Sequence, residues 1–512
     1  MHQHATATTV NLTEGNTETA DRNAVAILIA IALATVLVHL VLGDNYGFHP
    51  DELATLDDAR HLAWGYVAYP PVTPFLARVS LVLFGASLRW FRLFSSLAMA
   101  TVVVLAGLMA REMGGRRWAQ VVAAICAVPY CLSVGVLMQY VAFDALAWAL
   151  TAYFVIRLLK SANARWWIAI GMSIGFGMLC KWTMGFLALG VVAGVLLTND
   201  RRYLKSKWLW IGVGLCLLVF MPNLLWEWRH NFVSLDMLKH IHERDIGRGL
   251  TTYFLPQQFQ LTGLRTPIAI AGVYFCFFTN KGRRFRMIGW MYLVPLVLFV
   301  ILRGRWYYLG AAYSMLYATG SVWGESWLGS KEPKKAKALR GDVSAILAVD
   351  ILFTALFLPI PPVQTKWWNF AASKMADYKD EVGWPDLVRE VARIRDSLPP
   401  GQRERVGILT GDYGEAGAIN LYGPQYGLPP AISGVNSFWA RGYGKPAPAV
   451  LILVGFDQWY VDEHFVSCRI AGHPWNRYGV TNKESDEHRD IFVCGPPRMG
   501  WPEFWKDFRS YD

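Results

Sequence analysis

An acidic pair, Asp51-Glu52, stands a few residues after the first long apolar run of the chain, residues 24–42. That run has about the length at which a helix crosses a bilayer, so the pair is expected at the membrane surface. Ionisable groups are costly to keep near hydrocarbon, and a carboxylate there can take a proton from an attacking hydroxyl group. The structural alternative is that Pro50 begins a short helix and that both acids only complement its positive end.

Further ionisable side chains stand at the ends of later apolar runs, on the side where the acidic pair is expected. Asp144 lies at the start of the fourth run, where capping of the helix is the alternative to a binding role. Lys181 interrupts about thirty apolar residues, where a snorkelling lysine is the alternative to a phosphate contact. The turn at 303–308, rich in Arg and Tyr, either binds an anionic ligand or anchors its spans at the interface. Arg89 and Arg92, at the outer start of the second run, could bind an anion in the same way.

The composition indicates a membrane domain joined to a soluble one. Of the 512 residues, 54% are hydrophobic and only 17% are charged, and the mean hydropathy is +0.27. A wholly soluble chain would carry more charge. Eleven spans are expected, at about 24–42, 89–110, 118–135, 142–159, 166–180, 183–198, 208–226, 257–278, 287–302, 307–326 and 342–360.

Clusters of Lys and Arg fall at every second connection between the expected spans. They are Arg111/Arg116/Arg117, Arg157/Lys160/Arg165, Arg201/Arg202/Lys205/Lys207, Lys281/Arg283/Arg284/Arg286 and Lys331/Lys334/Lys335/Lys337/Arg340. The positive-inside rule places these clusters and the N-terminus in the cytoplasm, and an odd number of spans then places the C-terminus outside. The net charge of +11 is therefore a topology signal, and no nucleic-acid partner is expected.

The chain is expected to divide into three parts. Residues 1–23 are polar and predict a disordered cytoplasmic terminus, followed by a first span that is retained as an anchor. Residues 24–360 form the membrane domain. Residues 361–512 have ordinary polarity and predict a small α/β domain outside the membrane, with a helix near 388–398 and buried strands near 405–410 and 449–454.

The first external loop, residues 43–88, is too long to lack internal structure. Two short helices are expected in it, at about 50–64 and 75–84. The apolar residues of the first helix share one face, which indicates a helix lying in the plane of the membrane interface. They are Leu53, Leu56 and Leu62/Ala63.

The cysteines and histidines show no spacing typical of a metal site. Five of the seven cysteines fall in expected spans and are best explained as small buried residues. Cys468 and Cys494 lie in the external domain, where a disulfide can persist, and the sequence leaves their pairing open.

The order of these features resembles the glycosyltransferase family 39 proteins, a group that includes protein O-mannosyltransferases and the aminoarabinose and galacturonic acid transferases of lipopolysaccharide. The likeness extends over about residues 24–330 and rests on Asp51-Glu52 in a structured external loop, Cys180-Lys181-Trp182 and Arg305-Trp306-Tyr307-Tyr308-Leu309. External segments at 383–385, 412–419 and 436–439 look like a bacterial subgroup. The resemblance implies a polytopic helical protein of the GT-C fold. It also implies transfer of a hexosyl or pentosyl group, with inversion, from a polyprenyl-phosphate carrier on the extracytoplasmic side.

The resemblance and the chemistry together assign roles to individual residues. Asp51 would be the base that deprotonates the acceptor, and Glu52 would orient it or the sugar. The donor phosphate would be contacted by Lys181, Arg303, Arg305, Tyr307 and Tyr308. The sugar or the acceptor would be bound by Asp144, Tyr140 and Trp64. No cofactor or metal is required, although Asp51 and Asp144 could hold a metal if they converge.

The expected partners are a membrane lipid carrier and an envelope acceptor that is a lipid, a glycan or a protein, in the bacterial inner membrane. A flippase or transporter of lipid carriers would need charges distributed through the spans toward the cytoplasmic side. It would also often show internal repeats, and no obvious duplication is present. A scaffold for envelope assembly would not need acids and cations on the same face. The sequence therefore favours the transferase.

Overall fold

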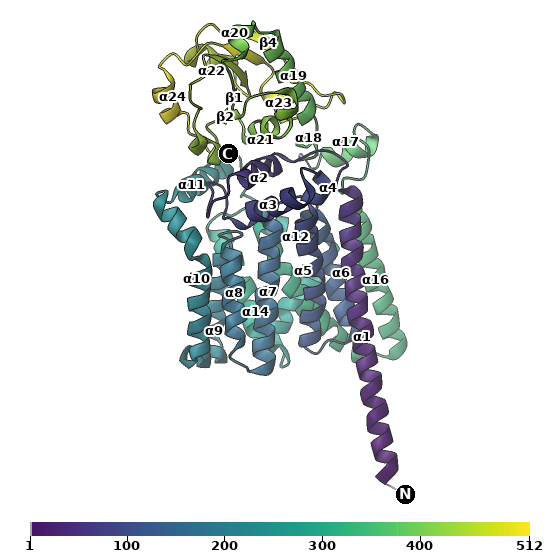
Figure 1. The fold of residues 1–512 in the computed structure, drawn as a ribbon. Helices are drawn as coiled ribbons and strands as arrows, with labels where there is room; N and C mark the ends of the chain where they lie inside the picture. The colour runs from purple at the N-terminus through teal and green to yellow at the C-terminus, as the bar shows by residue number, and fades with distance from the viewer. Residues whose placement is uncertain (1–2, 376) are drawn as a thin grey trace.

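The chain forms a helical bundle with a smaller domain at one end of it (Figure 1). The structure is a computed structural model that describes residues 3–375 and 377–512, with side chains described from Asn23 onward. The long bundle helices are α1 (Gln3–Leu42), α5 (Leu93–Glu112), α6 (Arg117–Val134), α7 (Tyr140–Ser161), α8 (Trp166–Met178), α9 (Met184–Leu197), α10 (Lys207–Arg229), α12 (Phe254–Thr262), α13 (Thr266–Phe278), α14 (Arg286–Ile301), α15 (Tyr313–Gly329) and α16 (Pro333–Ala355). Each of the eleven expected spans overlaps one of these helices, or the pair α12 and α13.

Short helices lie between the long ones. They are α4 (Leu88–Phe91) and the 3-10 helices η1 (Asn199–Lys205), η2 (Gly263–Arg265), η3 (Gly282–Phe285) and η4 (Trp306–Ala312). By length and composition alone, seven helices of the described chain could cross a membrane, or eight if α9 and η1, bent by 102°, form one span. α16 is long but less apolar, and it carries Asp350, whose carboxylate lies 2.7 Å from Arg265 Nε. A partner of opposite charge makes such a carboxylate tolerable inside a bundle.

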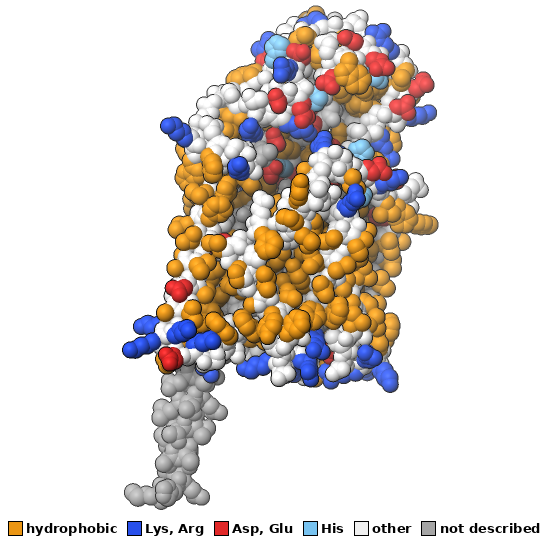
Figure 2. Space-filling model, turned by 180° about the vertical axis from the view of Figure 1, so that it is seen from behind, with side chains coloured by type: hydrophobic (Ala, Val, Ile, Leu, Met, Phe, Trp, Pro, Cys, Tyr) orange, Lys and Arg blue, Asp and Glu red, His pale blue; other side chains and the backbone are white. Residues whose placement is uncertain are grey.

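A broad band of hydrophobic side chains covers the face of the bundle seen in Figure 2. Lys and Arg gather at the end of the bundle opposite the C-terminal domain, as Figure 2 also shows. This distribution is typical of a multi-span membrane protein, and the expected fold class is confirmed. Which end faces the cytoplasm stays a prediction.

Glycine allows the bundle helices to approach closely. A Cβ on Gly171 of α8 would lie 2.0 Å from the carbonyl oxygen of Gly212 of α10. A Cβ on Gly212 would in turn lie 2.2 Å from the carbonyl oxygen of Trp167. The two helices are therefore in backbone contact, which holds the short α8 firmly against its longer neighbour.

The N-terminal helix differs from the expected boundary. α1 begins at Gln3, within the stretch 1–23 that the sequence predicts to be disordered. Starting a helix is costly whereas extending one is not, so the apolar run from residue 24 can propagate its helix into the polar residues before it.

Three helices lie between the bundle and the domain: α2 (Pro50–Arg60), α3 (Val72–Phe84) and α11 (Val233–Gly247) (Figure 1). Both expected loop helices are present, but the expected placement of the first in the membrane interface is wrong. Leu53 is fully buried and packs against Gly417 of α21 (Tyr413–Tyr422) in the C-terminal domain, whereas Leu62 lies beyond the end of α2 and is exposed. An apolar helix face indicates burial without indicating whether lipid or protein covers it.

The C-terminal domain is built on a five-stranded sheet with the strand order β2-β1-β3-β5-β4. The strands are β1 (Val406–Thr410), β2 (Ala431–Ser433), β3 (Val450–Val454), β4 (Arg469–Gly472) and β5 (Ile491–Cys494). β1 is parallel to β2 and β3, and β5 is antiparallel to β3 and β4. The helices besides α21 are α17 (Lys366–Ala372), α18 (Asp377–Asp380), α19 (Trp384–Ser397), α20 (Pro400–Arg403), α22 (Gln458–His464), α23 (Lys483–Glu487), α24 (Trp501–Asp507), η5 (Gly423–Tyr426) and η6 (Asn436–Arg441). The expected α/β domain is thus present.

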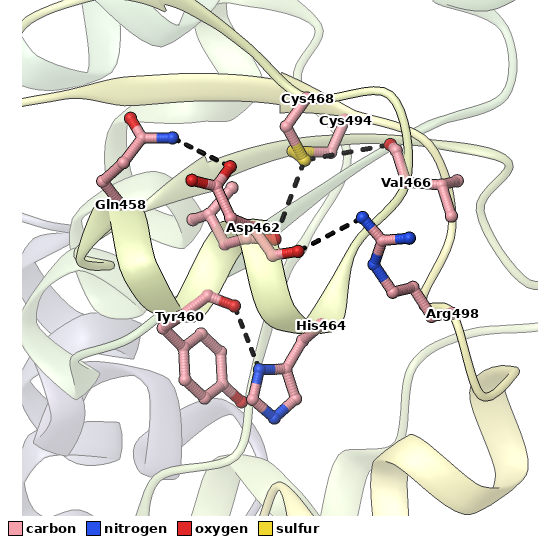
Figure 3. The surroundings of a disulfide bond; sticks show 9 residues. Gln458, Tyr460, Asp462, His464, Val466, Cys468, Cys494 and Arg498 are labelled. Carbon is pink, nitrogen blue, oxygen red and sulfur yellow. Dashed lines mark hydrogen bonds between the residues drawn. A yellow bond between two sulfur atoms is a disulfide. The ribbon is translucent and has the colours of Figure 1, made fainter.

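Cys468 and Cys494 form a disulfide, which answers the question that the sequence left open (Figure 3). The bond joins the residue before β4 to the last residue of β5, across a separation of 26 residues. Beside it, Arg498 Nη2 donates to the backbone oxygen of Asp462 at 3.2 Å and holds α22 against this corner of the domain.

Candidate active site

Asp51 is held from the membrane domain and from the C-terminal domain at once. It lies in the first turn of α2, which His49 caps. Its Oδ1 accepts a hydrogen bond from Tyr413 Oη at 2.8 Å, and its Oδ2 accepts one from Gln139 Nε2 at 2.9 Å. The side chain is still 34% exposed. The carboxylate is therefore fixed in direction and also accessible, as a base requires.

Glu52 has a different place from its neighbour. It is fully buried and accepts hydrogen bonds from Arg92 Nε at 2.9 Å and Arg92 Nη2 at 2.6 Å. It also accepts from the backbone nitrogens of His49 at 3.0 Å and Met138 at 2.8 Å. The helix-capping alternative thus applies to Glu52, which fixes the start of α2 and the segment that carries Gln139. Arg92 serves this carboxylate, so its expected role in binding an anion is wrong.

Lys181 lies in the turn between α8 and α9, surrounded by tyrosines. Its Nζ is 3.9 Å from the ring centroid of Tyr308, 5.1 Å from that of Tyr140 and 5.8 Å from that of Tyr307. The residue is only 9% exposed, so it does not snorkel to the surface. Burial lowers the pKa of Lys181 to about 8, against the opposing charge of Asp144. A bound anion would favour its charged form.

Asp144 ties α7 to the turn that carries Lys181. Its Oδ1 accepts a hydrogen bond from Trp148 Nε1 at 3.1 Å, and its Oδ2 accepts one from Thr183 Oγ1 at 3.2 Å. The cap of α7 is Gln139, so the alternative that Asp144 caps this helix is wrong. The geometry suits a residue that positions Lys181.

Arg305 lies beside the tyrosine cluster and is bound by an acid that the sequence did not single out. Its Nε and Nη2 donate to the two carboxylate oxygens of Asp245 in α11, at 2.5 and 3.0 Å, and its Nη1 donates to Tyr307 Oη at 3.0 Å. Arg303 is exposed in the same turn, in a left-handed conformation with φ of 48°. Trp64 is 60% exposed, and its backbone oxygen accepts from Asn223 of α10. The structure therefore places Arg303 and Trp64 apart from the contacts described above.

Tyr140 connects the acid to the cations. Lys181 lies over its ring, and it is within electrostatic reach of Asp51, Arg305 and Tyr308. The cluster of Asp51, Tyr140, Asp144, Lys181, Arg305, Tyr307 and Tyr308, here called the acid–cation cluster, thus gathers seven of the ten expected site residues in one place. Chemically, it offers an accessible carboxylate next to a buried cation and several hydroxyl donors.

The comparisons with known proteins agree with this arrangement. Residues 68–226 match the family model described as dolichyl-phosphate-mannose-protein mannosyltransferase. ArnT from Cupriavidus metallidurans bound to undecaprenyl phosphate has a TM-score of 0.55 and 16% sequence identity, and the match covers 93% of this chain and 98% of that one. The apo state of the same protein gives 0.56 and 15% over the same shares. A comparison with curated protein sequences finds no match. The chain therefore has the fold of ArnT, and its resemblance to the GT-C glycosyltransferases of family 39 is confirmed.

Proposed function

We propose that the chain is an inverting membrane glycosyltransferase that moves a sugar from a polyprenyl-phosphate carrier to an envelope acceptor on the extracytoplasmic face. The observation that carries this proposal is the acid–cation cluster, in which Asp51 lies on the same side of the bundle as Lys181 and Arg305. The matched mannosyltransferase model covers Tyr140, Asp144 and Lys181 of this cluster. The fold shared with ArnT, which has been seen with undecaprenyl phosphate, supports the choice of donor.

The reaction needs one base and one site for a leaving phosphate. Asp51 removes the proton of the acceptor hydroxyl group as its oxygen attacks the anomeric carbon. The bond between that carbon and the phosphate oxygen breaks on the opposite face, and the polyprenyl phosphate leaves with the electron pair. Lys181 and Arg305 stabilise the negative charge that develops on it, and Tyr307 and Tyr308 offer hydroxyl donors. A single displacement of this kind inverts the configuration of the sugar.

The remaining residues of the cluster position these groups. Asp144 holds the turn of Lys181 through Thr183, and Asp245 holds the guanidinium of Arg305. Tyr140 lies between the two sides, where the sugar would sit. The acceptor is a lipid, a glycan or a protein of the envelope, and the sugar is a hexosyl or pentosyl group. The protein lies in the inner membrane, with its N-terminus in the cytoplasm and its C-terminal domain outside.

The fold and the family match favour the transferase over a flippase of lipid carriers. Mass spectrometry of envelope lipids and glycans, from cells with and without the protein, identifies the sugar and its acceptor. Purified protein should then release free polyprenyl phosphate from the sugar-charged carrier only when that acceptor is present. The new glycosidic bond should have the inverted configuration. Recovery of the intact charged carrier after prolonged incubation, or its movement across vesicle membranes unbroken, would reject the proposal.

A further inference from the structure

The C-terminal domain contacts the candidate base through the first turn of α21. β1 ends at Thr410, and Asp412 then caps α21 by accepting a hydrogen bond from the backbone nitrogen of Gly414 at 2.6 Å. Tyr413, the first residue of α21, reaches Asp51 across a sequence separation of 362 residues. This turn follows the carboxyl end of β1, between β2 and β3, where open α/β sheets commonly present functional groups.

The contact is fixed by the packing of α21 against α2. A Cβ on Gly417 would lie 2.7 Å from Leu53, and one on Gly414 would lie 3.0 Å from Pro50, so the two helices touch with no room for a larger side chain. Asn420 Nδ2, at the other end of α21, donates to Asp57 Oδ1 at 2.6 Å. The close packing of α21 against α2 thus places Tyr413 next to Asp51.

Arg441 of the same domain reinforces the interface. It forms ion pairs with both Asp57 and Asp58 of α2, the second at 2.5 Å. Arg60 Nη1 of α2 donates in return to the backbone oxygen of Asn420 at 2.7 Å. Asp57, Asp58 and Arg60 of α2 are therefore engaged in docking the domain.

A second set of ion pairs connects the start of α21 to α11, the helix that holds Arg305 of the acid–cation cluster. Lys483 Nζ lies 2.9 Å from Asp412 Oδ2 and 3.3 Å from Asp512 Oδ2. Asp512 pairs with Arg244 of α11, whose neighbour Asp245 holds Arg305. The C-terminal domain, which contacts Asp51, is thus also connected to α11, the helix that holds Arg305.

We propose that Tyr413 is a positioning residue for the base Asp51, so that the C-terminal domain forms part of the catalytic centre; this rests on the proposed function. Burial, together with the charge of Asp51, raises the pKa of Tyr413 well above its usual range, so its hydroxyl group remains a donor. With Gln139 on the other oxygen, it fixes the carboxylate rotamer. The base is then held in one orientation relative to the acceptor hydroxyl group.

Tyr413→Phe tests this because it keeps the ring and removes only the donor. The expected result is a fall in kcat of about tenfold, the order of one hydrogen bond to a charged group, with the KM for the lipid donor unchanged. Tyr478→Phe, in the same domain at a residue that is 45% exposed, is the matched control and should behave as the unchanged protein.

The double variant separates positioning from a general structural effect. Tyr413→Phe should cost nothing further in an Asp51→Asn background, because the hydroxyl group acts only through that carboxylate. An unchanged kcat in Tyr413→Phe, or an equal loss in both backgrounds, overturns the inference while leaving the transferase intact. Absence of transfer by the unchanged protein would instead reject the proposed function, and the inference with it.

Discussion

Asp51 differs from the other acids of its loop in what its carboxylate contacts. Asp57 and Asp58 are buried and paired with Arg441, and Glu52 is paired with Arg92. The hydrogen bonds of Asp51 come from a phenol and an amide, both uncharged. Those three carboxylates are buried, whereas the side chain of Asp51 is 34% exposed and stays accessible between its two neutral donors. Asp51 is therefore the acid of this loop that best fits the proposed base.

Asp51→Asn should leave the protein folded and inserted but abolish sugar transfer. The amide keeps the shape of the side chain and cannot accept the proton, so the expected loss is about 10²–10⁴-fold in kcat. Turnover assays with purified protein in lipid nanodiscs measure it. Near-normal turnover would contradict the assignment of Asp51 as the base and would make Asp144 the next candidate.

Lys181 should make use of the donor depend on pH. The pKa of Lys181 is lowered to about 8, so the free protein loses this charge as the pH rises through that value. The KM for the donor should therefore rise above about pH 8, and Lys181→Arg should remove the rise because a guanidinium stays charged. Lys181→Ala should raise KM at every pH. A pH-independent KM in the unchanged protein would contradict the role.

Arg305→Lys should recover only part of the activity that Arg305→Ala loses. A lysine keeps the charge but cannot bind both oxygens of Asp245 while donating to Tyr307. Donor KM and kcat should be compared with those of Arg248→Ala, an exposed cation near the end of α11. Full activity of Arg305→Ala would exclude this arginine from the phosphate site.

The sequence analysis identified most of the acid–cation cluster but not the residues that hold its members in place. Asp51, Lys181 and Arg305 stood out because charge at the edge of an apolar run is costly and therefore informative. Tyr413 and Asp245 lie 362 and 60 residues away from the partners they hold, in segments of ordinary polarity. Their role appears only when the chain brings α21 and α11 next to the bundle.

At the scale of elements, α2 shows that a hydrophobic pattern predicts a buried helix face but not what covers that face. Its apolar face was recognised, but that face covers α21 and not lipid. The strands β1 and β3 were predicted well because fully buried strands have continuous apolar sequences. α16 was predicted despite Asp350, although its pairing with Arg265 could not be foreseen from either segment alone.

The junction of α18 and α19 with the bundle should respond to pH. Glu381 lies there, 3.3 Å from Arg92, and shares that guanidinium with Glu52. Burial, against the attraction of Arg92, raises the pKa of Glu381 from 4.5 to about 7. The folded state therefore holds this proton more tightly than the unfolded chain. The contribution of Glu381 to stability is fully present below about pH 4.5, falls as the pH rises to about 7, and is constant above it.

Glu381→Gln should consequently stabilise the protein at pH 8 and change little near pH 4.5. The gain in the free energy of unfolding is at most about 3 kcal/mol, which is the energy equivalent of the pKa shift of Glu381. Thermal unfolding in detergent, followed at several pH values, measures it. Glu404→Gln, at an exposed site in the same domain, is the control. A Tm that falls at pH 8 and is unchanged at pH 4.5 would show instead that Glu381 is needed as an anion.

At the scale of the whole molecule, the C-terminal domain, which contacts Asp51, lies at one end of the bundle, and Lys and Arg gather at the other end (Figures 1 and 2). Reporter fusions test the side on which each end lies. Fusions at Arg117, Lys207 and Lys337 should report the cytoplasm, and fusions at His240, Arg303 and Arg405 should report the exterior. A C-terminal domain found in the cytoplasm would contradict the proposed transferase, because the acid–cation cluster would then lie on the cytoplasmic side.

The disulfide also restrains the segment of the C-terminal domain that contacts the start of α21. The loop that it closes contains Lys483, which braces the start of α21. Closing a loop of this size removes about 3–4 kcal/mol of chain entropy from the unfolded state. Thiols stay reduced in the cytosol, so a chain still being inserted lacks this restraint. If the C-terminal domain lies outside the cytoplasm, as proposed, this restraint forms only after the domain has crossed the membrane.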